Sequence, residues 1–517
     1  MSKKFDFNLD IHGQTVPASR AWQMGIGNDH AFQLMRTDVS SHLKRACDEI
    51  GFRYVRFHGI FNDDMRIIQS FADQKGFNAL PGADKIRECN FRRVSVVLDN
   101  ILSCGLKPFV ELSFMPKALA GGTETGLAYN ANVSMPKDFF AWAELIRAFI
   151  EFAFSRYGKE EVESWYFEVW NEPDLTLFFS GNMEDYFALY EVTAHTIKEI
   201  DPNLRVGGPA TSACKWLEEF KTFCDVNNVP YDFLSTHHYP GDAFGNLLSD
   251  RPAGHLRNVA AECVKNKVPL GEAMTALFYD PAESSRWQKG AFRKMDEQAR
   301  AVAGSKPLFI TEWNSTSVFA APIHDEKYSA AFVVKSVMDA GNIAEGYMFW
   351  CCSDVFEEMF DLGKPFHGAF GIVSSDGIPK PNFYAFKLLS ELYPRRYALP
   401  VTDDAVELAS FTDGESVQLL LYAQEFDCRK DEEFSVKITL NGAFACAGKT
   451  AIDDTHCNPK AEWQKLGKPD LLTPVQVEKI RKNTSLVREE IPLRVSANVT
   501  TLNVSMRTND VILIELN

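Results

Sequence analysis

The sequence predicts an α/β protein, in which a (β/α)8 TIM barrel is followed by an antiparallel β-sandwich accessory domain. From about residue 19 to residue 387, short apolar runs alternate with longer segments of helical periodicity. Eight such repeats are typical of a parallel barrel. After about residue 388 the pattern changes to short strands separated by turn residues, which is typical of a β-sandwich.

Eight apolar runs are the candidate barrel strands. Several are almost continuously apolar, as expected of parallel strands covered on both faces. An open doubly wound sheet is the alternative, but no G-x-G-x-x-G or phosphate-binding loop opens a predicted helix. The predicted strands are residues 21–27, 54–61, 107–114, 166–172, 205–209, 233–239, 308–313 and 346–350. Helical periodicity is clearest in residues 138–150, 183–200 and 328–342.

We expect residues 16–389 to form the barrel, and residues 1–15 with 390–517 to form the sandwich. The predicted sandwich strands are residues 417–422, 434–440 and 510–516, joined by the alternating residues 4–9. The connection 242–305 is long for a barrel and contains helical pieces, so we expect it to form a lid or an oligomer contact.

The composition excludes several classes of partner. The chain has 54 lysine and arginine residues against 70 aspartate and glutamate residues, a net charge of -16, whereas nucleic acids and anionic membranes select clustered basic residues. No apolar run approaches the roughly 18 residues of a membrane span. The N-terminal stretch lacks the apolar segment of roughly 7–15 residues found in a secretory signal. We therefore expect a cytoplasmic protein.

The cysteines do not indicate a metal or a disulfide framework. Eleven cysteines are scattered singly, apart from the adjacent Cys351 and Cys352. No C-x-x-C pair or Cys/His cluster has zinc-site spacing. His58 could join a histidine of the sixth strand in a metal site, but no H-x-x-x-H or carboxylate–histidine spacing supports it. We expect reduced thiols, no metal and no cofactor.

Two glutamates end apolar runs that are predicted strands. Glu172 ends the fourth run and Glu312 the seventh. Barrel active sites lie at the C-terminal ends of the strands, and a carboxylate at the rim of a core is a candidate acid, base or nucleophile. From these strands the side chains could converge to the roughly 5–5.5 Å of a retaining glycosidase. For either glutamate alone, a salt-bridged residue at a strand end is the alternative.

The residues around Glu172 limit its backbone. Pro173 disfavours the α region for the residue before it, so we expect Glu172 to be extended. Strict alternation points only one of Asn171 and Glu172 inward. A bend or bulge is therefore needed if both serve the site.

The sixth run ends in Thr236-His237-His238-Tyr239. Alternation places His237 and Tyr239 on one face and His238 on the other. If the first pair faces inward, it could orient a glutamate and bind a sugar hydroxyl, while a satisfied core histidine beside a tyrosine fits the pattern equally well. Trp350 and Phe178 are candidates for a sugar-packing wall or for the core.

Together these residues resemble glycoside hydrolase family 39, in a clan of (β/α)8 retaining glycosidases whose acid/base and nucleophile end strands four and seven. The resemblance spans most of residues 20–390. The W-N-E-P motif alone would indicate only the clan, but the combination is specific. The matching motifs are residues 54–65, 170–175, 236–240, 311–314 and 349–358.

The resemblance implies a role for each site residue. Glu172 would be the general acid/base and Glu312 the nucleophile, while Asn171 would bond the sugar 2-hydroxyl. The residues implied to hold other hydroxyls or the catalytic pair are His58, His237, Tyr239 and Glu357. Trp350 and Phe178 would form the apolar walls. The resemblance also implies a homo-oligomer, with the tetramer common among bacterial members.

The resulting hypothesis is a retaining exo-glycosidase, a β-xylosidase that releases xylose from short β-xylosides by double displacement. An arabinose- or uronide-releasing enzyme of the same family is one alternative, and a non-catalytic sugar-binding protein on this scaffold is another. Two features depart from the family pattern and bear on the substrate: His238 in place of a small residue, and Cys351-Cys352 after Trp350.

Overall fold

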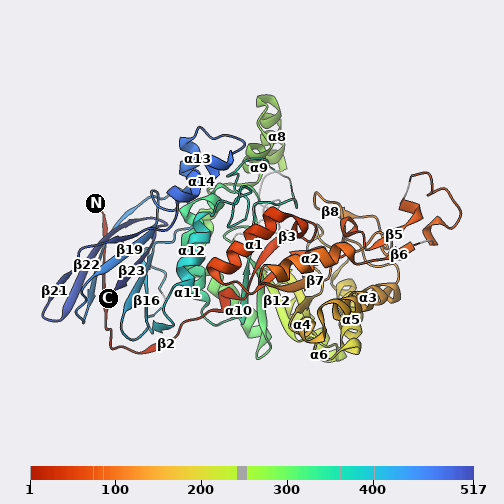
Figure 1. Cartoon of the computed structure of the whole chain (residues 1–517), viewed down its shortest axis with the longest axis horizontal. Coiled ribbons are helices and arrows are strands. Elements are labelled where there is room, and N and C mark those ends of the chain that lie inside the picture. Colours follow the sequence, from red (N-terminus) through yellow and green to blue (C-terminus); the bar gives the residue numbers. More distant parts are fainter. Residues whose placement is uncertain (1, 74, 86, 241–252, 360–361, 401) are drawn as a thin grey trace.

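The computed structural model describes residues 2–73, 75–85, 87–240, 253–359, 362–400 and 402–517. A closed barrel lies beside a two-sheet sandwich, and both ends of the chain lie at the sandwich (Figure 1). The predicted fold class is confirmed.

Eight parallel strands close the barrel in the order β10-β11-β12-β13-β14-β3-β4-β7. Each predicted run contributes one strand. The strands are β3 (Gly25–His30), β4 (Tyr54–His58), β7 (Lys107–Glu111), β10 (Tyr166–Glu168), β11 (Arg205–Ser212), β12 (Phe233–His238), β13 (Leu308–Trp313) and β14 (Gly346–Phe349).

The strand boundaries differ from the prediction most where the backbone leaves the extended region. β10 ends at Glu168, so Glu172 lies in the loop that follows it. Trp170 has φ 71° and Glu172 has φ 38°, both in the left-handed region that L-residues rarely adopt. The expectation that Pro173 keeps Glu172 extended is therefore wrong. The backbone bends at Trp170 and Glu172, and this is the bend that is needed for both Asn171 and Glu172 to serve one site.

Helices surround the barrel, and each predicted helix is present. They include α1 (Thr37–Ile50), α2 (Arg92–Ser103), α3 (Phe139–Tyr157), α5 (Met183–Ile200), α6 (Leu217–Asn227), α10 (Ala291–Ala303), α11 (Lys327–Ala340) and α12 (Pro381–Ser390). Helix α11 is buried on every face from Tyr328 to Ala340, because it lies between the barrel and the sandwich (Figure 1). A helix buried on all sides needs such a position, and its buried charges Lys335 and Asp339 pair with each other at 2.9 Å.

The sandwich consists of a four-stranded and a seven-stranded sheet. Its strands pair antiparallel, except that the N-terminal β1 (Lys3–Leu9) pairs parallel with β18 (Glu433–Leu440). Strand β1 is therefore an edge strand of the four-stranded sheet. The division into residues 16–389 and residues 1–15 with 390–517 stays a prediction, and the short strand β2 (Thr15–Pro17), at its first boundary, pairs with β15 (Arg395–Tyr397) of the sandwich.

Part of the long connection 242–305 covers the barrel. Residues 242–252 lie outside the described residues. Of the rest, α10 packs on α6 and α11 as a barrel helix, whereas α8 (Ala253–Asn266) projects from the molecule (Figure 1). On α9 (Leu270–Phe278), Met274 is buried in a cluster with Tyr239 and Trp350, which places this helix at the rim of the candidate site.

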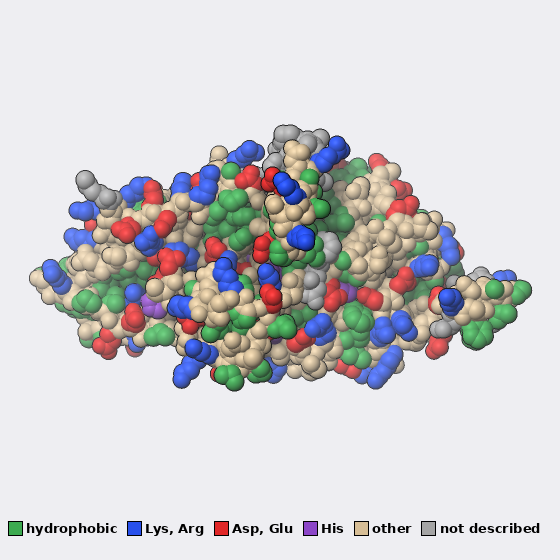
Figure 2. Space-filling model, turned by 90° about the horizontal axis from the view of Figure 1, so that it is seen from above, with side chains coloured by type: hydrophobic (Ala, Val, Ile, Leu, Met, Phe, Trp, Pro, Cys, Tyr) green, Lys and Arg blue, Asp and Glu red, His purple; other side chains and the backbone are tan. Residues whose placement is uncertain are grey.

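Charges of both signs are interspersed over the face drawn in Figure 2, rather than gathered by sign. A mixed surface of this kind offers no continuous basic track for a polyanion. Among the described helices, none has the length and apolar character needed to cross a bilayer.

Candidate active site

The site begins with Arg56, a fully buried arginine inside the barrel. Alternation along β4 points Tyr54, Arg56 and His58 into the barrel interior. The Arg56 guanidinium donates to Glu168 Oε2 at 2.6 Å, to Glu312 Oε1 at 2.7 Å and to Asn171 Oδ1 at 2.8 Å. Burial disfavours its charge, but the surrounding carboxylates raise the pKa of Arg56 above its ordinary value. Arg56 thus fixes both Glu312 and Asn171, the residue that precedes Glu172.

Glu312 lies on β13, and donors hold both of its oxygens. Arg56 donates to Oε1, and the Tyr239 hydroxyl donates to Oε2 at 2.8 Å. His58 Nε2 lies 3.5 Å from Oε1, and His237 Nδ1 lies 3.7 Å from Oε2. These contacts hold the Glu312 carboxylate in a fixed orientation.

Glu172 reaches the same space from the loop after β10. Its Oε1 lies 2.9 Å from His237 Nδ1, and its backbone N–H donates to Ala210 O at 3.0 Å.

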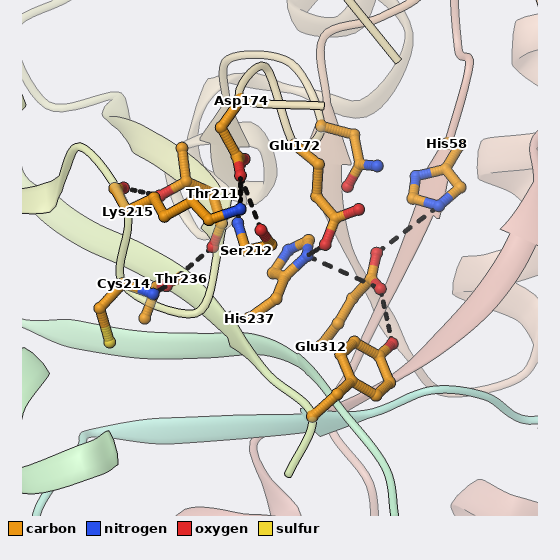
Figure 3. Close-up of polar contacts among 12 residues, drawn as sticks. His58, Glu172, Asp174, Thr211, Ser212, Cys214, Lys215, Thr236, His237 and Glu312 are labelled. Carbon is orange, nitrogen blue, oxygen red and sulfur yellow. Dashed lines mark hydrogen bonds and ion pairs between the residues drawn. The ribbon is translucent and has the colours of Figure 1, made fainter. Parts of the chain in front are cut away.

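 The Glu172 and Glu312 carboxylates lie near each other, with the His237 ring beside both (Figure 3). The pKa of His237 is lowered well below its ordinary value, chiefly by burial and then by the nearby Arg56 and His58. His237 is therefore neutral, and it can exchange a hydrogen bond with Glu172 in either protonation state of the glutamate.

The two carboxylates are close enough for a retaining mechanism. One oxygen each of Glu172 and Glu312, and one His237 nitrogen, all lie within 4.8 Å of one another. Retaining glycosidases hold their carboxyl groups at about 5–5.5 Å, whereas inverting ones leave about 6.5–9.5 Å for a water molecule. The same three groups could geometrically surround a cation, but their separation already matches that of a catalytic pair.

A second charged pair lies beside Glu312. His58 Nδ1 contacts Glu111 Oε2 at 2.5 Å, and its Nε2 contacts Glu358 Oε1 at 2.9 Å. Burial opposes the imidazolium, but these two glutamates raise the pKa of His58 well above its ordinary value. Burial raises the pKa of Glu358 to about 7, although His58 acts in the opposite direction. This pair brings a protonatable carboxyl group to the cavity wall.

Glu358, and not the predicted Glu357, faces the cavity. The Glu357 side chain is 39% exposed and lies 3.9 Å from Arg36, while its backbone N–H donates to Asp29. Adjacent residues of this irregular segment point in opposite directions, and the sequence did not show which of the two points inward. The implied contact of Glu357 with substrate is therefore not supported by its position.

The other predicted residues surround the same cavity or support it. Phe178, Tyr239 and Trp350 line it together with His58 and both catalytic candidates. Asn171 is buried behind Glu172, where its Oδ1 accepts from Arg56 and its Nδ2 has no protein partner among the described residues. The remaining described lining residues are Leu127, Leu177, Ser317, Phe319, Glu358, Met359 and Phe370.

Sequence reasoning missed Arg56, Glu111 and Glu168. All three are charged residues inside predicted apolar strands, and all are fully buried. Buried charges require partners, so a charged residue at an inward position of a barrel strand was a signal that could have identified them. Their partners lie on other strands, and only the closed barrel shows which charges meet.

Comparison with known proteins agrees with this geometry. The model of glycosyl hydrolases family 39 matches residues 7–251 and 269–500. A β-xylosidase from Caldicellulosiruptor saccharolyticus is 34% identical over 96% of this chain and 95% of its own length. A β-xylosidase from Geobacillus stearothermophilus is 31% identical, over 96% and 92%.

A solved structure extends the likeness to the fold. A monomeric β-xylosidase from Caulobacter crescentus CB15 superposes with a TM-score of 0.78 at 30% identity, covering 99% of both chains. The family match covers both the barrel and most of the sandwich, and it includes both glutamates. This chain is a retaining glycoside hydrolase, and it belongs to glycosyl hydrolases family 39.

Proposed function

We propose that this enzyme is an exo-acting β-xylosidase that releases xylose from short β-xylosides. The observation that carries the proposal is the pair of carboxylates, Glu172 and Glu312, within 4.8 Å of each other beside one neutral histidine. The two β-xylosidases that match almost the whole chain support xylose as the sugar.

In the first step, Glu312 attacks the anomeric carbon and forms a glycosyl ester, while Glu172 donates its proton to the departing oxygen. Arg56 and Tyr239 each hold one oxygen of Glu312, so the nucleophile keeps its direction during attack. In the second step, ionised Glu172 takes a proton from water, and the water oxygen displaces Glu312. Two inversions leave the sugar with its original configuration.

The sugar would be bound by polar and apolar groups that face the cavity. Asn171 Nδ2 is buried and has no partner among the described residues, so it is a candidate donor to the 2-hydroxyl, a contact that strengthens in the transition state. Glu358 and His58 can hold other hydroxyls. Phe178 and Trp350 supply apolar cavity walls, which suit the C–H faces of a sugar ring.

The charge of the cavity favours a neutral sugar over a uronide. Glu172, Glu312 and Glu358 all contribute carboxyl groups to the lining, and like charges at close range repel. Much of the remaining lining is apolar, including Phe319, Met359 and Phe370. This environment suits a pentose, although an arabinoside remains an alternative of the same charge. A non-catalytic binding protein would have no need for two carboxylates at the retaining distance.

Hydrolysis of p-nitrophenyl glycosides tests the proposal. The panel contains β-D-xyloside, α-L-arabinoside and α-L-iduronide, assayed with the wild type, Glu312→Ala and the exposed-site control Glu433→Ala. We expect the wild type and the control to prefer the β-xyloside, and Glu312→Ala to lose about 10⁴-fold or more in kcat. Ordinary rates from Glu312→Ala would remove it as the nucleophile, and a preference for another glycoside would replace xylose.

Glu172→Ala tests the acid/base assignment separately. With its proton donor removed, the variant should retain activity toward a good p-nitrophenol leaving group but lose it toward xylobiose. Azide should then restore turnover by attacking the glycosyl ester without base assistance. A variant that hydrolyses xylobiose at the wild-type rate would contradict the assignment.

We propose a homo-oligomer, with a tetramer as the expected form. Exposed apolar side chains support it, since Phe71, Phe77 and Leu80 on the projecting segment around strands β5 (Ile68–Ser70) and β6 (Arg87–Cys89) are 47%, 51% and 53% exposed. The Caulobacter relative is described as monomeric. Sedimentation equilibrium decides between the two, because a mass of one chain at micromolar concentration contradicts the oligomer.

We propose a cytoplasmic location. The eleven cysteines are all free in the structure, as is common in a reducing compartment. Fractionation of the producing cells, with activity measured in each fraction, tests this proposal.

A further inference from the structure

A second group of reactive side chains lies on the outer face of β12, where alternation directs His238 away from the barrel interior. His238 Nε2 lies 3.3 Å from Cys214 Sγ, and His238 Nδ1 lies 2.7 Å from Asp296 Oδ1. Cys214 lies in the turn after β11, His238 on β12 and Asp296 on α10. A thiol, an imidazole and a carboxylate in this order are the arrangement that activates a cysteine nucleophile.

The imidazole and the carboxylate are held rigidly. His238 and Asp296 are fully buried, the Tyr347 hydroxyl donates to Asp296 Oδ2 at 2.8 Å, and the Phe292 ring packs edge-on against His238. Burial lowers the pKa of His238, but Cys214 and Asp296 outweigh it and raise the value to about 9. At neutral pH the ring is therefore a cation that can donate from Nδ1 to Asp296 and from Nε2 to sulfur.

Cys214 differs from the other cysteines in both partners and backbone. Among the described residues, no other cysteine sulfur lies within hydrogen-bonding distance of a histidine ring nitrogen. Cys214 is only half-buried, and it lies in a turn where it and Ala213 have φ of 61° and 49°. A partly exposed thiol beside a cationic imidazole is the environment of a reactive cysteine, whereas a buried structural thiol is inert.

We propose that Cys214, activated by His238 and Asp296, is a reactive thiol site at which a hydroperoxide oxidises the protein and thereby slows the glycosidase. Nothing in hydrolysis of a glycoside requires such a group, so this site goes beyond the proposed function. The enzyme would then carry an oxidant-sensitive control element on the outside of its barrel.

The oxidation step balances without another reactant. With the Cys214 proton on His238, the thiolate attacks one oxygen of the hydroperoxide, so that an S–O bond forms and the O–O bond breaks. Sulfur loses two electrons and becomes a sulfenic acid, while the peroxide is reduced. For hydrogen peroxide, the departing hydroxide takes the proton from His238 Nε2 and leaves as water. A thiol reductant returns Cys214 to its starting state.

The turn that carries Cys214 also supports the acid/base candidate. Ala210 O accepts from the Glu172 backbone N–H at 3.0 Å, and Ala213 donates to His237 O at 3.0 Å. Ser212 makes two hydrogen bonds with Asp174, at 3.0 Å and 2.6 Å (Figure 3). The Cys214 side chain itself points away from Glu172 (Figure 3), so an oxygen on its sulfur would not touch Glu172 directly. The oxygen would act by displacing the turn, which is hydrogen-bonded to the Glu172 loop through Ala210.

Labelling of the native enzyme tests the reactive thiol without any glycoside. The protein is treated with limiting iodoacetamide, or with hydrogen peroxide and dimedone, and the modification of each cysteine is followed by peptide mass spectrometry. We expect Cys214 to react about tenfold faster or more than the more exposed Cys89 and Cys446. A Cys214 rate no greater than theirs overturns the proposal, and this comparison requires no variant.

Two variants test activation by the neighbouring groups. Asp296→Asn and the milder Tyr347→Phe should slow labelling of Cys214, with the larger effect in Asp296→Asn, while labelling of Cys89 in the same sample stays unchanged as an internal control. If both variants label Cys214 at the wild-type rate, the imidazole is not activating it and the proposal fails.

Activity measurements test the link to Glu172. Peroxide should lower kcat of the wild type, and dithiothreitol should restore it. In peroxide, Cys214→Ser should keep the kcat that it has without peroxide. The control Cys89→Ser should lose and regain kcat as the wild type does. Sulfenic acid at Cys214 without any change in kcat would overturn the control role. The labelling results, which are read by mass, do not depend on which glycoside the enzyme hydrolyses, whereas the kcat results use the glycoside on which the enzyme is active.

Discussion

The interior of the barrel contains two layers built by the same strands, and they follow opposite rules. Near the strand starts the layer is apolar and aromatic, and its members are Met24, Phe109, Phe233, Phe309 and Met348, with Tyr54 and Tyr166 packed against them. Two residues further along, the same strands supply a charged layer made of Arg56, Glu111 and Glu168.

Alternation explains how one strand contributes to both layers. Successive inward residues are two apart, so β4 supplies Tyr54 and then Arg56, β7 supplies Phe109 and then Glu111, and β10 supplies Tyr166 and then Glu168. Strand β12 follows the same rule, with Phe233 in the apolar layer and Ser235 and His237 as the next inward residues.

The two layers therefore differ in the substitutions that they tolerate. In the apolar layer, Phe109 contacts Tyr166, Phe233 and Phe309 at ring-centroid distances of 5.1, 5.6 and 5.9 Å, and the requirement is filled volume. In the charged layer each group needs a specific partner, because an unpaired buried charge is costly. The lower layer therefore supports the site mechanically, while the upper layer sets its chemistry.

The largest expected effect comes from removing the cation of the charged layer. Arg56→Met leaves Glu168 buried without its counter-charge and Glu111 with His58 as its remaining charged partner. We expect a loss of about 3–5 kcal/mol in unfolding free energy together with loss of measurable activity. Urea unfolding and kcat/KM measure the two effects. Adding Glu168→Gln removes one stranded charge and should restore part of the stability but none of the activity. A double variant less stable than Arg56→Met would contradict the pairing.

A cavity in the apolar layer should affect stability alone. Phe109→Ala removes a fully buried ring and should cost about 3–5 kcal/mol. Since the ring contacts no catalytic group, kcat/KM per folded molecule should stay within about twofold of the wild type, as an order-of-magnitude expectation for a change outside the site. Unfolding curves and assays well below the unfolding temperature measure this. A large fall in kcat/KM would show that the two layers are coupled.

Glu358, which pairs with His58 beside the charged layer, predicts a pH dependence that the aromatic layer lacks. The pKa of Glu358 is about 7 in the folded protein against an ordinary 4.5, so the folded state holds a proton that the unfolded chain releases. Stability from this group is therefore lost as pH rises from 4.5 through about 7. Between about pH 5 and 6.5, Glu358→Gln should flatten the decline by up to about 1 kcal/mol per pH unit. Phe109→Ala should keep the wild-type slope, and equal slopes in Glu358→Gln and wild type would contradict the assignment.

The smallest effect is expected for a volume-conserving exchange in the apolar layer. Met348→Leu should cost less than about 1.5 kcal/mol and leave kcat/KM unchanged, as measured by thermal unfolding and assay. The matched shape-conserving exchange in the charged layer, Glu111→Gln, should lower kcat/KM because His58 loses a charged partner at 2.5 Å. If both exchanges were silent, the distinction between the layers would not hold.

The site was predictable from the sequence to the extent that strand position decides it. Glu172 and Glu312 follow apolar runs, and barrel geometry places strand ends at one mouth. Glu357 was predicted, whereas Glu358 lines the cavity, because this segment is irregular and no periodicity reveals which neighbour points inward. Arg56 was missed because its partners come from three different strands, and pairing between strands is not written in any one of them.

The sequence by itself determined the eightfold alternation of strands and helices, the β-rich C-terminal part and the two strand-end glutamates, because hydrophobic periodicity and turn residues act locally along the chain. Only the tertiary structure decided that Glu172 has a left-handed backbone, that its carboxylate lies within 4.8 Å of Glu312, and that Cys214, His238 and Asp296 meet outside the barrel. Those features depend on strand register and on helix packing, which bring together residues that are distant in sequence.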